Sequence, residues 1–113
     1  MTSAITQAKL WYWQRISALV LALCVVVHLA IIIYAVRGGL SAAEILGRTH
    51  GNWLLGGFYA VFLLACAVHV PIGLATIAAE WLDWRGRSAE VAAALCGALI
   101  AVLGLGAIYG LAA

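Results

Sequence analysis

Charge is what this sequence has least of: six basic and four acidic residues make 9% of 113 residues charged, against about 25% in typical soluble domains. So few charges cannot solvate the surface of a globular protein of this size, which excludes a water-soluble domain. The formal net charge of +2 is also too small to indicate nucleic-acid binding.

Cysteine is scarce too, and the three residues Cys24, Cys66 and Cys96 are spread over three separate apolar stretches. This placement is typical of small hydrophobic packing residues and argues against a disulfide framework or a zinc site. Carboxylates are absent from the same stretches, with Glu80 at the edge of one. A small drug exporter would need a carboxylate at membrane depth for proton coupling, so that function class is disfavoured.

Three long segments without a charged residue determine the predicted fold; they cover residues 16–36, 49–79 and 91–113. At about 1.5 Å per residue, each can cross a hydrocarbon core of about 30 Å as a helix. Their continuous apolar runs lack the alternating polarity of a barrel strand. We therefore predict an all-α protein with three transmembrane helices that form part of a membrane bundle. The chain is expected to be one domain, 1–113, with helices at about 16–36, 53–81 and 89–112.

The connecting segments give local predictions. Ser41 and Glu44 have the spacing of a capping box, which predicts a short helical turn in the first loop. Ser88, with Glu90 in the next turn, is expected to open the third helix, and Pro71 is expected to bend the second. Four basic residues flank the N-terminal side and two the other side, which predicts a cytoplasmic N-terminus. They are Lys9, Arg15, Arg85 and Arg87 against Arg37 and Arg48.

Two histidines, His28 and His69, lie within the predicted helices, where an ionisable group is costly and by default functional. Counted from the cytoplasmic ends of the charge-free segments, at Ile16 and Ala79, His28 lies about 18 Å deep and His69 about 15 Å deep. Neighbouring antiparallel helices would then hold both imidazoles at nearly one level. Because neutral imidazole is a common ligand of haem iron, the pair predicts a b-type haem with two histidine ligands. The alternative is that each imidazole bonds a backbone carbonyl across a helix contact.

The helix faces that carry the histidines favour the haem interpretation. Narrow or polar residues share the face of His28, and Gly73, one turn from His69, leaves space for a porphyrin edge. Polar members of both faces gather at the cytoplasmic end and predict a wet pocket beside the haem. They are Gln14 and Ser17 from the first helix and Thr76 and Glu80 from the second.

Two motifs mark the ends of the first two helices: Gln14-Arg15-Ile16-Ser17-Ala18, and His69-Val70-Pro71-Ile72-Gly73 followed by Glu80-Trp81. Together with the three-helix layout, they resemble the membrane-anchor subunits of succinate dehydrogenase and fumarate reductase, respiratory complex II. The resemblance implies that His69, in its His-x-x-x-Gly setting, ligates haem b. It also implies a quinone site formed with Arg15, Ser17, Glu80 and Trp81.

Two residues depart from the pattern of that family. The small-anchor type has a tyrosine after the acidic residue, whereas this chain has Trp81, and an indole N–H cannot accept a hydrogen bond as a phenol does. His28 is matched in the fused two-haem cytochromes of the family, which carry a histidine in each of the first two helices. Matched depth favours one haem shared by His28 and His69, whereas those relatives favour two haems shared with a partner.

The function that the resemblance implies is membrane anchoring and electron transfer between an iron–sulfur subunit and quinone, as in the tricarboxylic acid cycle. The sequence has no flavin or iron–sulfur motif, so the chain is not catalytic alone and implies a flavoprotein and an iron–sulfur subunit. A second membrane-anchor subunit is expected as well, because three helices cannot enclose a haem.

The third helix offers that second subunit a surface through the small-residue pairs Gly97 with Ala101 and Gly106 with Gly110. The expected location is a bacterial cytoplasmic (inner) membrane. The alternative function is a haem-free structural or assembly subunit of another respiratory complex.

Overall fold

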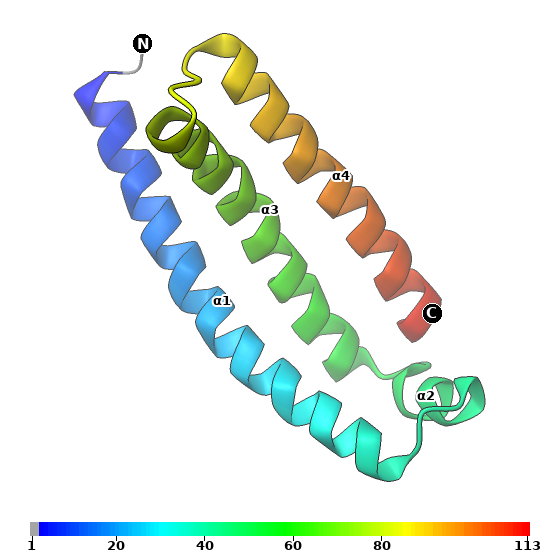
Figure 1. Ribbon diagram of the computed structural model, residues 1–113. Coiled ribbons are helices and arrows are strands. Elements are labelled where there is room, and N and C mark those ends of the chain that lie inside the picture. The colour runs from blue at the N-terminus through cyan, green and yellow to red at the C-terminus, as the bar shows by residue number, and fades with distance from the viewer. Residues whose placement is uncertain (1–2) are drawn as a thin grey trace.

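Residues 3–113 are described by the computed structural model, and they form four helices and no strand. The helices are α1 (Ala4–Gly38), α2 (Ala42–Thr49), α3 (Trp53–Trp81) and α4 (Arg87–Ala112). Three of them, α1, α3 and α4, are long and apolar enough to cross a membrane. The predicted all-α class with three potential membrane spans is therefore confirmed (Figure 1).

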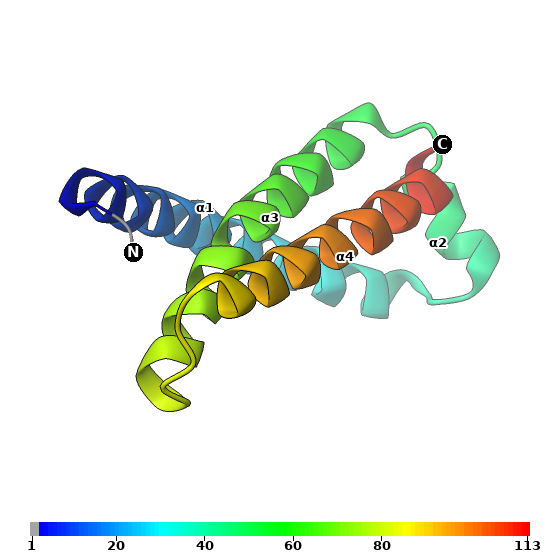
Figure 2. The ribbon, with the colours of Figure 1, turned by 90° about the horizontal axis from the view of Figure 1, so that it is seen from above.

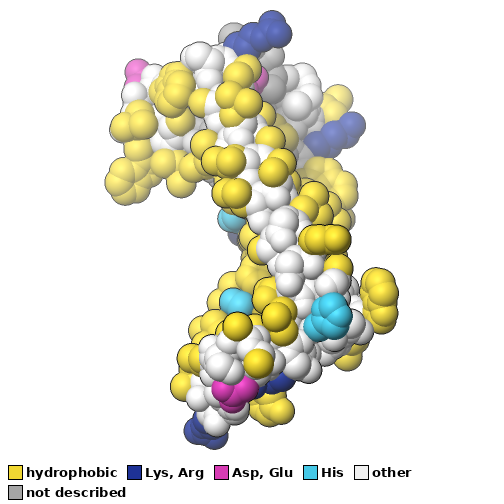
Figure 3. Space-filling view, turned by 90° about the vertical axis from the view of Figure 1, so that its right-hand side faces the viewer, with side chains coloured by type: hydrophobic (Ala, Val, Ile, Leu, Met, Phe, Trp, Pro, Cys, Tyr) yellow, Lys and Arg dark blue, Asp and Glu magenta, His cyan; other side chains and the backbone are white. Residues whose placement is uncertain are grey.

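The central helix is α3, which packs against α1 on one side and α4 on the other in a body of 50 × 23 × 22 Å. The short α2 lies beside the C-terminal end of α4, where the Gly51 N–H donates to the Ala112 carbonyl at 2.8 Å. At the opposite end α1 diverges from α3, as Figure 2 shows from above. Charged side chains gather mainly towards the two ends, with apolar surface between them (Figure 3). This distribution suits helices whose middle sections face lipid.

The first long helix begins at Ala4, twelve residues before the predicted start at Ile16. The side chain of Ser3 caps this end. Lys9 and Arg15 therefore lie on a continuous helix, and their exposed side chains can extend along it towards water. The charge-free segment thus marks the apolar part of α1 and not its full length. The second long helix, α3, has the predicted bounds.

The loop helix and the start of α4 bear on the two capping predictions. Ser41 caps α2 as predicted: its hydroxyl oxygen accepts from the Glu44 backbone N–H at 3.2 Å, and the hydroxyl donates to the Glu44 carboxylate at 2.6 Å. Ser88 does not open α4, which begins directly after Gly86. Its hydroxyl instead accepts from the Trp84 indole N–H at 2.8 Å, so this prediction is wrong. The chain enters α4 through Gly86 at a φ of +91°, a conformation that glycine adopts without strain.

Two glycines bring α4 close to α3. A Cβ built on Gly97 would lie 2.5 Å from Cγ of Pro71, and one built on Gly104 would clash with a methyl carbon of Leu63. Gly97 is buried by this contact, so its expected use as a surface for a second subunit is wrong. Small residues permit close approach to any helix, and here the neighbour belongs to the same chain. Gly106 and Gly110, by contrast, have open space at the Cβ position.

The same proline bends α3, as the sequence predicts. The helix continues through Pro71 to Trp81. Its turns after the proline lean away from the direction of its first part (Figures 1 and 2). Proline has no N–H for the carbonyl of Ala67, and its ring crowds that carbonyl, which is a common cause of a kink. The bend carries the end of α3 away from the start of α1.

Candidate functional site

The contact between α1 and α3 holds both histidines of the long helices, and each Nδ1 lies against a hydroxyl of the facing helix. His69 Nδ1 is 3.2 Å from Ser17 Oγ, and His28 Nδ1 is 3.1 Å from the hydroxyl oxygen of Tyr59. Eleven residues separate Ser17 from His28 and ten separate Tyr59 from His69, so the imidazoles are about 15 Å apart along the helix axes. The prediction that the two histidines lie at one level is therefore wrong.

The true start of α1 is the physical reason for this difference. A depth counted from Ile16 leaves out the three turns that begin at Ala4. Extending the Ser17–His69 register along both helices brings Ala79 level with Gln7 and not with Ile16. One iron atom can bond two imidazoles only when both ring nitrogens lie within bonding distance of it. The geometry therefore does not fit one haem shared by His28 and His69.

The surroundings of His69 fit a histidine that would bind haem iron. Ser17 is 4% exposed and donates to the Gln14 backbone carbonyl at 3.1 Å while it contacts His69. The Nε2 atom of His69 has no hydrogen-bond partner within residues 3–113. At Gly73, one turn along α3, the absent side chain leaves the Gln14 amide nitrogen 3.1 Å from the Cβ position. Gln14 Oε1 is buried without a partner in the described part of the chain, so a ligand with an O–H or N–H group would satisfy it.

His28 has a different, aromatic environment. The rings of Tyr59 and Phe62 meet its imidazole edge-on, each with centroids 5.6 Å away. The contact between Tyr59 and His28 was not predicted from the sequence. The available signal was a phenol hydroxyl inside an apolar segment, where it needs a polar partner. Its partner could not be named without the register of α1 against α3.

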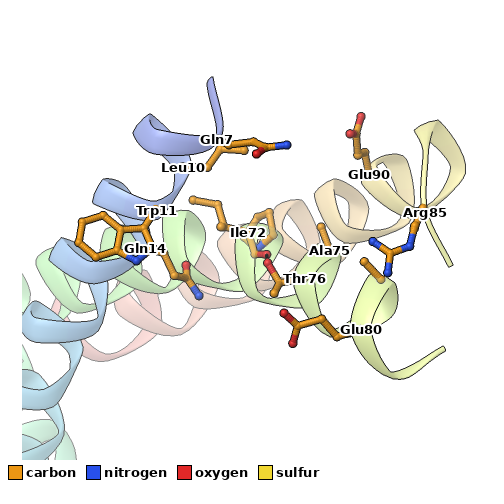
Figure 4. A pocket seen from close by; sticks show the side chains of 12 residues that line it. Gln7, Leu10, Trp11, Gln14, Ile72, Ala75, Thr76, Glu80, Arg85 and Glu90 are labelled. Atoms are coloured by element: carbon orange, nitrogen blue, oxygen red, sulfur yellow. Dashed lines mark hydrogen bonds between the residues drawn. The ribbon is translucent and has the colours of Figure 1, made fainter. Parts of the chain in front are cut away.

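A cavity of about 840 Å³ lies where α1 and α3 diverge, next to the start of α4 (Figure 4). The Gln14 side chain points from α1 towards Thr76 and Glu80 of α3, and Trp11 forms part of the α1 wall. Arg85 of the α3–α4 linker lines the far side. A mostly apolar cavity of this size with a few polar groups is typical of a small-molecule site. Of the four residues predicted to form a polar pocket at this end, Gln14, Thr76 and Glu80 line the cavity and Ser17 does not.

The other residues predicted for a quinone site lie outside this cavity. Ser17 contacts His69, and its hydroxyl donates to the Gln14 backbone carbonyl. The guanidinium of Arg15 lies over the Trp11 ring, 5.4 Å from its centroid, on the exposed side of α1. Trp81 is 82% exposed and does not line the cavity. Only Glu80 of this predicted set faces the cavity.

A second cavity, of about 640 Å³, lies at the other end of the molecule and is lined partly by Tyr59 and Arg48. Arg48 has a structural role there, because its guanidinium donates to the Gly39 carbonyl just beyond α1. A basic side chain at a helix C-terminus satisfies free carbonyls and complements the helix dipole. His50 is exposed at the end of α2. Neither side chain needs a ligand to explain its position.

No protein-family model, curated protein or solved structure matches this chain. Its function is therefore inferred from two local features of the α1–α3 contact. One is the imidazole of His69 with its hydrogen-bonded Ser17, and the other is the cavity that Gln14, Thr76 and Glu80 line. Together they place an imidazole and several polar groups in one region of an apolar protein.

Proposed function

We propose that this chain is a membrane-anchor subunit of a succinate:quinone oxidoreductase, complex II, in which His69 ligates haem b and the cavity beside Gln14 takes a quinone. The observation that carries the proposal is the adjacency of these two sites. Gln14 lines the cavity, and its backbone carbonyl accepts from the Ser17 hydroxyl that contacts His69. The two sequence motifs that resemble complex II anchors contain these same residues.

Haem b, when bound, supplies a centre that takes up and releases one electron. The chain's own residues bind the quinone and orient the His69 imidazole. Ser17 orients the His69 imidazole, and the Gln14 amide N–H group can donate to a quinone oxygen. The Thr76 hydroxyl donates to the Ile72 carbonyl at 2.9 Å, so its oxygen can accept from the O–H group of a quinol. Glu80 lies at the exposed end of the cavity, so its carboxyl group can pass protons between water and a quinone oxygen. Electrons are exchanged with a separate iron–sulfur subunit, so this chain is not an enzyme alone.

In this proposal Arg15 and Trp81 do not line the quinone site of the isolated chain. Both side chains are exposed near the cavity end of the molecule. They belong to the surface that meets the iron–sulfur and flavoprotein subunits, and they reach a quinone only if those subunits turn them inward.

A second membrane subunit completes the haem site. Among the described residues no side chain is less than 2% exposed, so the helices do not enclose an interior of their own. His69 has one unbonded ring nitrogen and no second histidine at its level. A second ligand of the haem iron and the opposite wall of the haem pocket would therefore come from a partner chain. In this proposal His28 serves a second haem at its own level, again with a partner.

The proposed orientation places the N-terminus in the cytoplasm of a bacterium, with the cavity facing the soluble subunits. It follows from the basic side chains at the cavity end, which include Lys9, Arg15 and Arg87. Alkaline phosphatase fused after Ala113 would be active outside the cytoplasmic membrane, whereas a fusion after Arg85 would be inactive. The opposite pattern would contradict the orientation.

Visible spectroscopy of the purified native complex tests the haem proposal. We expect a reduced-minus-oxidised b-type spectrum that loses the haem of His69 in the His69→Ala variant. The separation of the histidines predicts that His28→Ala leaves that haem in place, and His50→Ala is the matched loop control. A colourless complex would overturn the proposal and support a haem-free structural or assembly subunit instead.

A further inference from the structure

The Ser17 hydroxyl makes two polar contacts with a single hydrogen atom. Its oxygen lies 3.1 Å from the Gln14 backbone carbonyl oxygen and 3.2 Å from His69 Nδ1. Ser17 is 4% exposed, so these two neighbours and not bulk water determine where its hydrogen points. A carbonyl oxygen can only accept, whereas Nδ1 of a neutral imidazole either donates or accepts, depending on the tautomer.

Counting hydrogens selects one arrangement. If the Ser17 hydroxyl donated to His69 Nδ1, the contact with the Gln14 carbonyl would join two acceptors with no hydrogen between them. Both contacts are hydrogen bonds only when the hydroxyl donates to Gln14 and accepts from an Nδ1–H group. We propose that Ser17 is a positioning residue that holds His69 in the Nδ1–H tautomer and so presents the Nε2 lone pair as a metal ligand.

This inference rests on the proposed function only for the identity of the ligand at Nε2, which is haem iron. Histidines that bind metals commonly donate their other ring N–H to a fixed acceptor, which sets the tautomer and raises the basicity of the ligating nitrogen. Ser17 supplies that acceptor from the facing helix. The tautomer of His69 is a property of the chain before any iron binds.

His28 provides an internal comparison. The Tyr59 hydroxyl has no other hydrogen-bond partner among residues 3–113, so it is free either to donate to Nδ1 or to accept from it. The contact with the Tyr59 hydroxyl therefore does not fix the tautomer of His28. Ser17 differs because its one hydrogen is committed to Gln14.

The tautomer can be measured on the full chain, labelled with 15N-histidine and reconstituted in lipid nanodiscs at a pH where the imidazoles are neutral. Long-range 15N–1H correlations separate Nδ1–H from Nε2–H, and the His69→Gln variant assigns the signals of His69. We expect Nδ1–H in the native chain and in Ser17→Thr, which keeps the hydroxyl. In Ser17→Ala the tautomer ratio should move towards Nε2–H by about two- to tenfold, the range expected for one hydrogen bond. Tyr59→Phe should leave the His69 signals unchanged.

An Nε2–H signal for His69 in the native chain, or an unchanged ratio in Ser17→Ala, would overturn the inference. In the native complex, Ser17→Ala should also raise the haem midpoint potential, because a less basic imidazole stabilises ferric iron less, and Ser17→Thr should restore it. A colourless complex in which His69 is still Nδ1–H would refute the haem proposal and uphold the role of Ser17. A normal haem spectrum with unchanged potential and tautomer in Ser17→Ala would uphold the haem proposal and refute the role of Ser17.

Discussion

Pro71 of α3 packs its ring against the bare Cα of Gly97 on α4, where a Cβ would come within 2.5 Å of Cγ. The same proline bends α3 and lines the larger cavity. The contact therefore joins α4 to the residue that shapes the candidate quinone site. The third helix thus contributes to that site through packing as well as through Glu90, which lines the cavity directly.

Gly97→Ala is expected to destabilise the chain by about 1–3 kcal/mol, because the added methyl group overpacks the contact with Pro71. The matched control is Gly106→Ala, which places the same methyl group in open space on the same helix. The free energy of unfolding can be measured by SDS titration in detergent micelles. Equal stability of the two variants would show that α3 and α4 do not meet at this pair.

Tyr59→Phe removes the hydroxyl that contacts His28 Nδ1 and keeps the aromatic ring. We expect a loss of about 0.6 kcal/mol, the average for hydrogen bonds between membrane helices, and no more than about 1.7 kcal/mol. Tyr109→Phe is the control, because Tyr109 is 76% exposed. The same SDS titration applies, and a double-mutant cycle with His28→Ala isolates the coupling energy. A coupling energy of zero would contradict the hydrogen bond.

The existence of the three long helices could be predicted because length and the absence of charge are properties of each segment alone. The start of α1 could not, since Lys9 and Arg15 interrupt the apolar pattern without interrupting the helix. The predicted register of α1 against α3 was counted from that single boundary. The error therefore passed directly to the relative depth of His28 and His69.

The cavity was more predictable than the histidine contacts. Gln14, Thr76 and Glu80 share helix faces with the two histidines, and helical periodicity is enough to gather them. The pairing of Ser17 with His69 depends on which residues of two helices face each other, which periodicity within one helix does not determine. The packing of Gly97 against α3 of the same chain could not be predicted for a similar reason. A small residue permits close approach of any helix, so the sequence does not say which helix packs there.

The capping box of α2 predicts a pH effect at the far end of the molecule. Hydrogen bonds from the Ser41 hydroxyl and backbone lower the pKa of the Glu44 carboxyl below its ordinary value of 4.5. The contribution of Glu44 to the stability of α2 is therefore fully present above pH 4.5 and is lost as the pH falls through the lowered pKa. A carboxyl NMR titration in micelles should show this lowered value, and Ser41→Ala should return it towards 4.5. An identical titration in both proteins would mean that the capping box does not form.

Filling the larger cavity tests whether a quinone uses it. Ala75 lines the cavity between Ile72 and Ala79, and Ala75→Leu would place a larger apolar side chain in the cavity. In the assembled complex we expect kcat/KM for quinone reduction to fall about tenfold or more, a loss of about 1.4 kcal/mol in transition-state stabilisation. The spectrum of the proposed haem at His69 should persist, because Ala75 is more than one turn away along α3.

Ala94→Leu is the matched control for this variant, since Ala94 is exposed on α4 and does not line the cavity. If both variants reduced quinone at the native rate, the cavity would not be the quinone site. If Ala75→Leu also lost the haem, the change would have disturbed the α1–α3 contact itself. In that case Thr76→Val tests whether a quinone occupies the cavity, because it removes only the hydroxyl that lines the cavity. That hydroxyl already donates to the Ile72 carbonyl. Because that hydrogen is donated to Ile72, the Thr76 oxygen can only accept a hydrogen bond from the O–H group of a quinol. If this bond forms, kcat/KM should fall in the variant, and an unchanged kcat/KM would show that Thr76 does not contact the ligand.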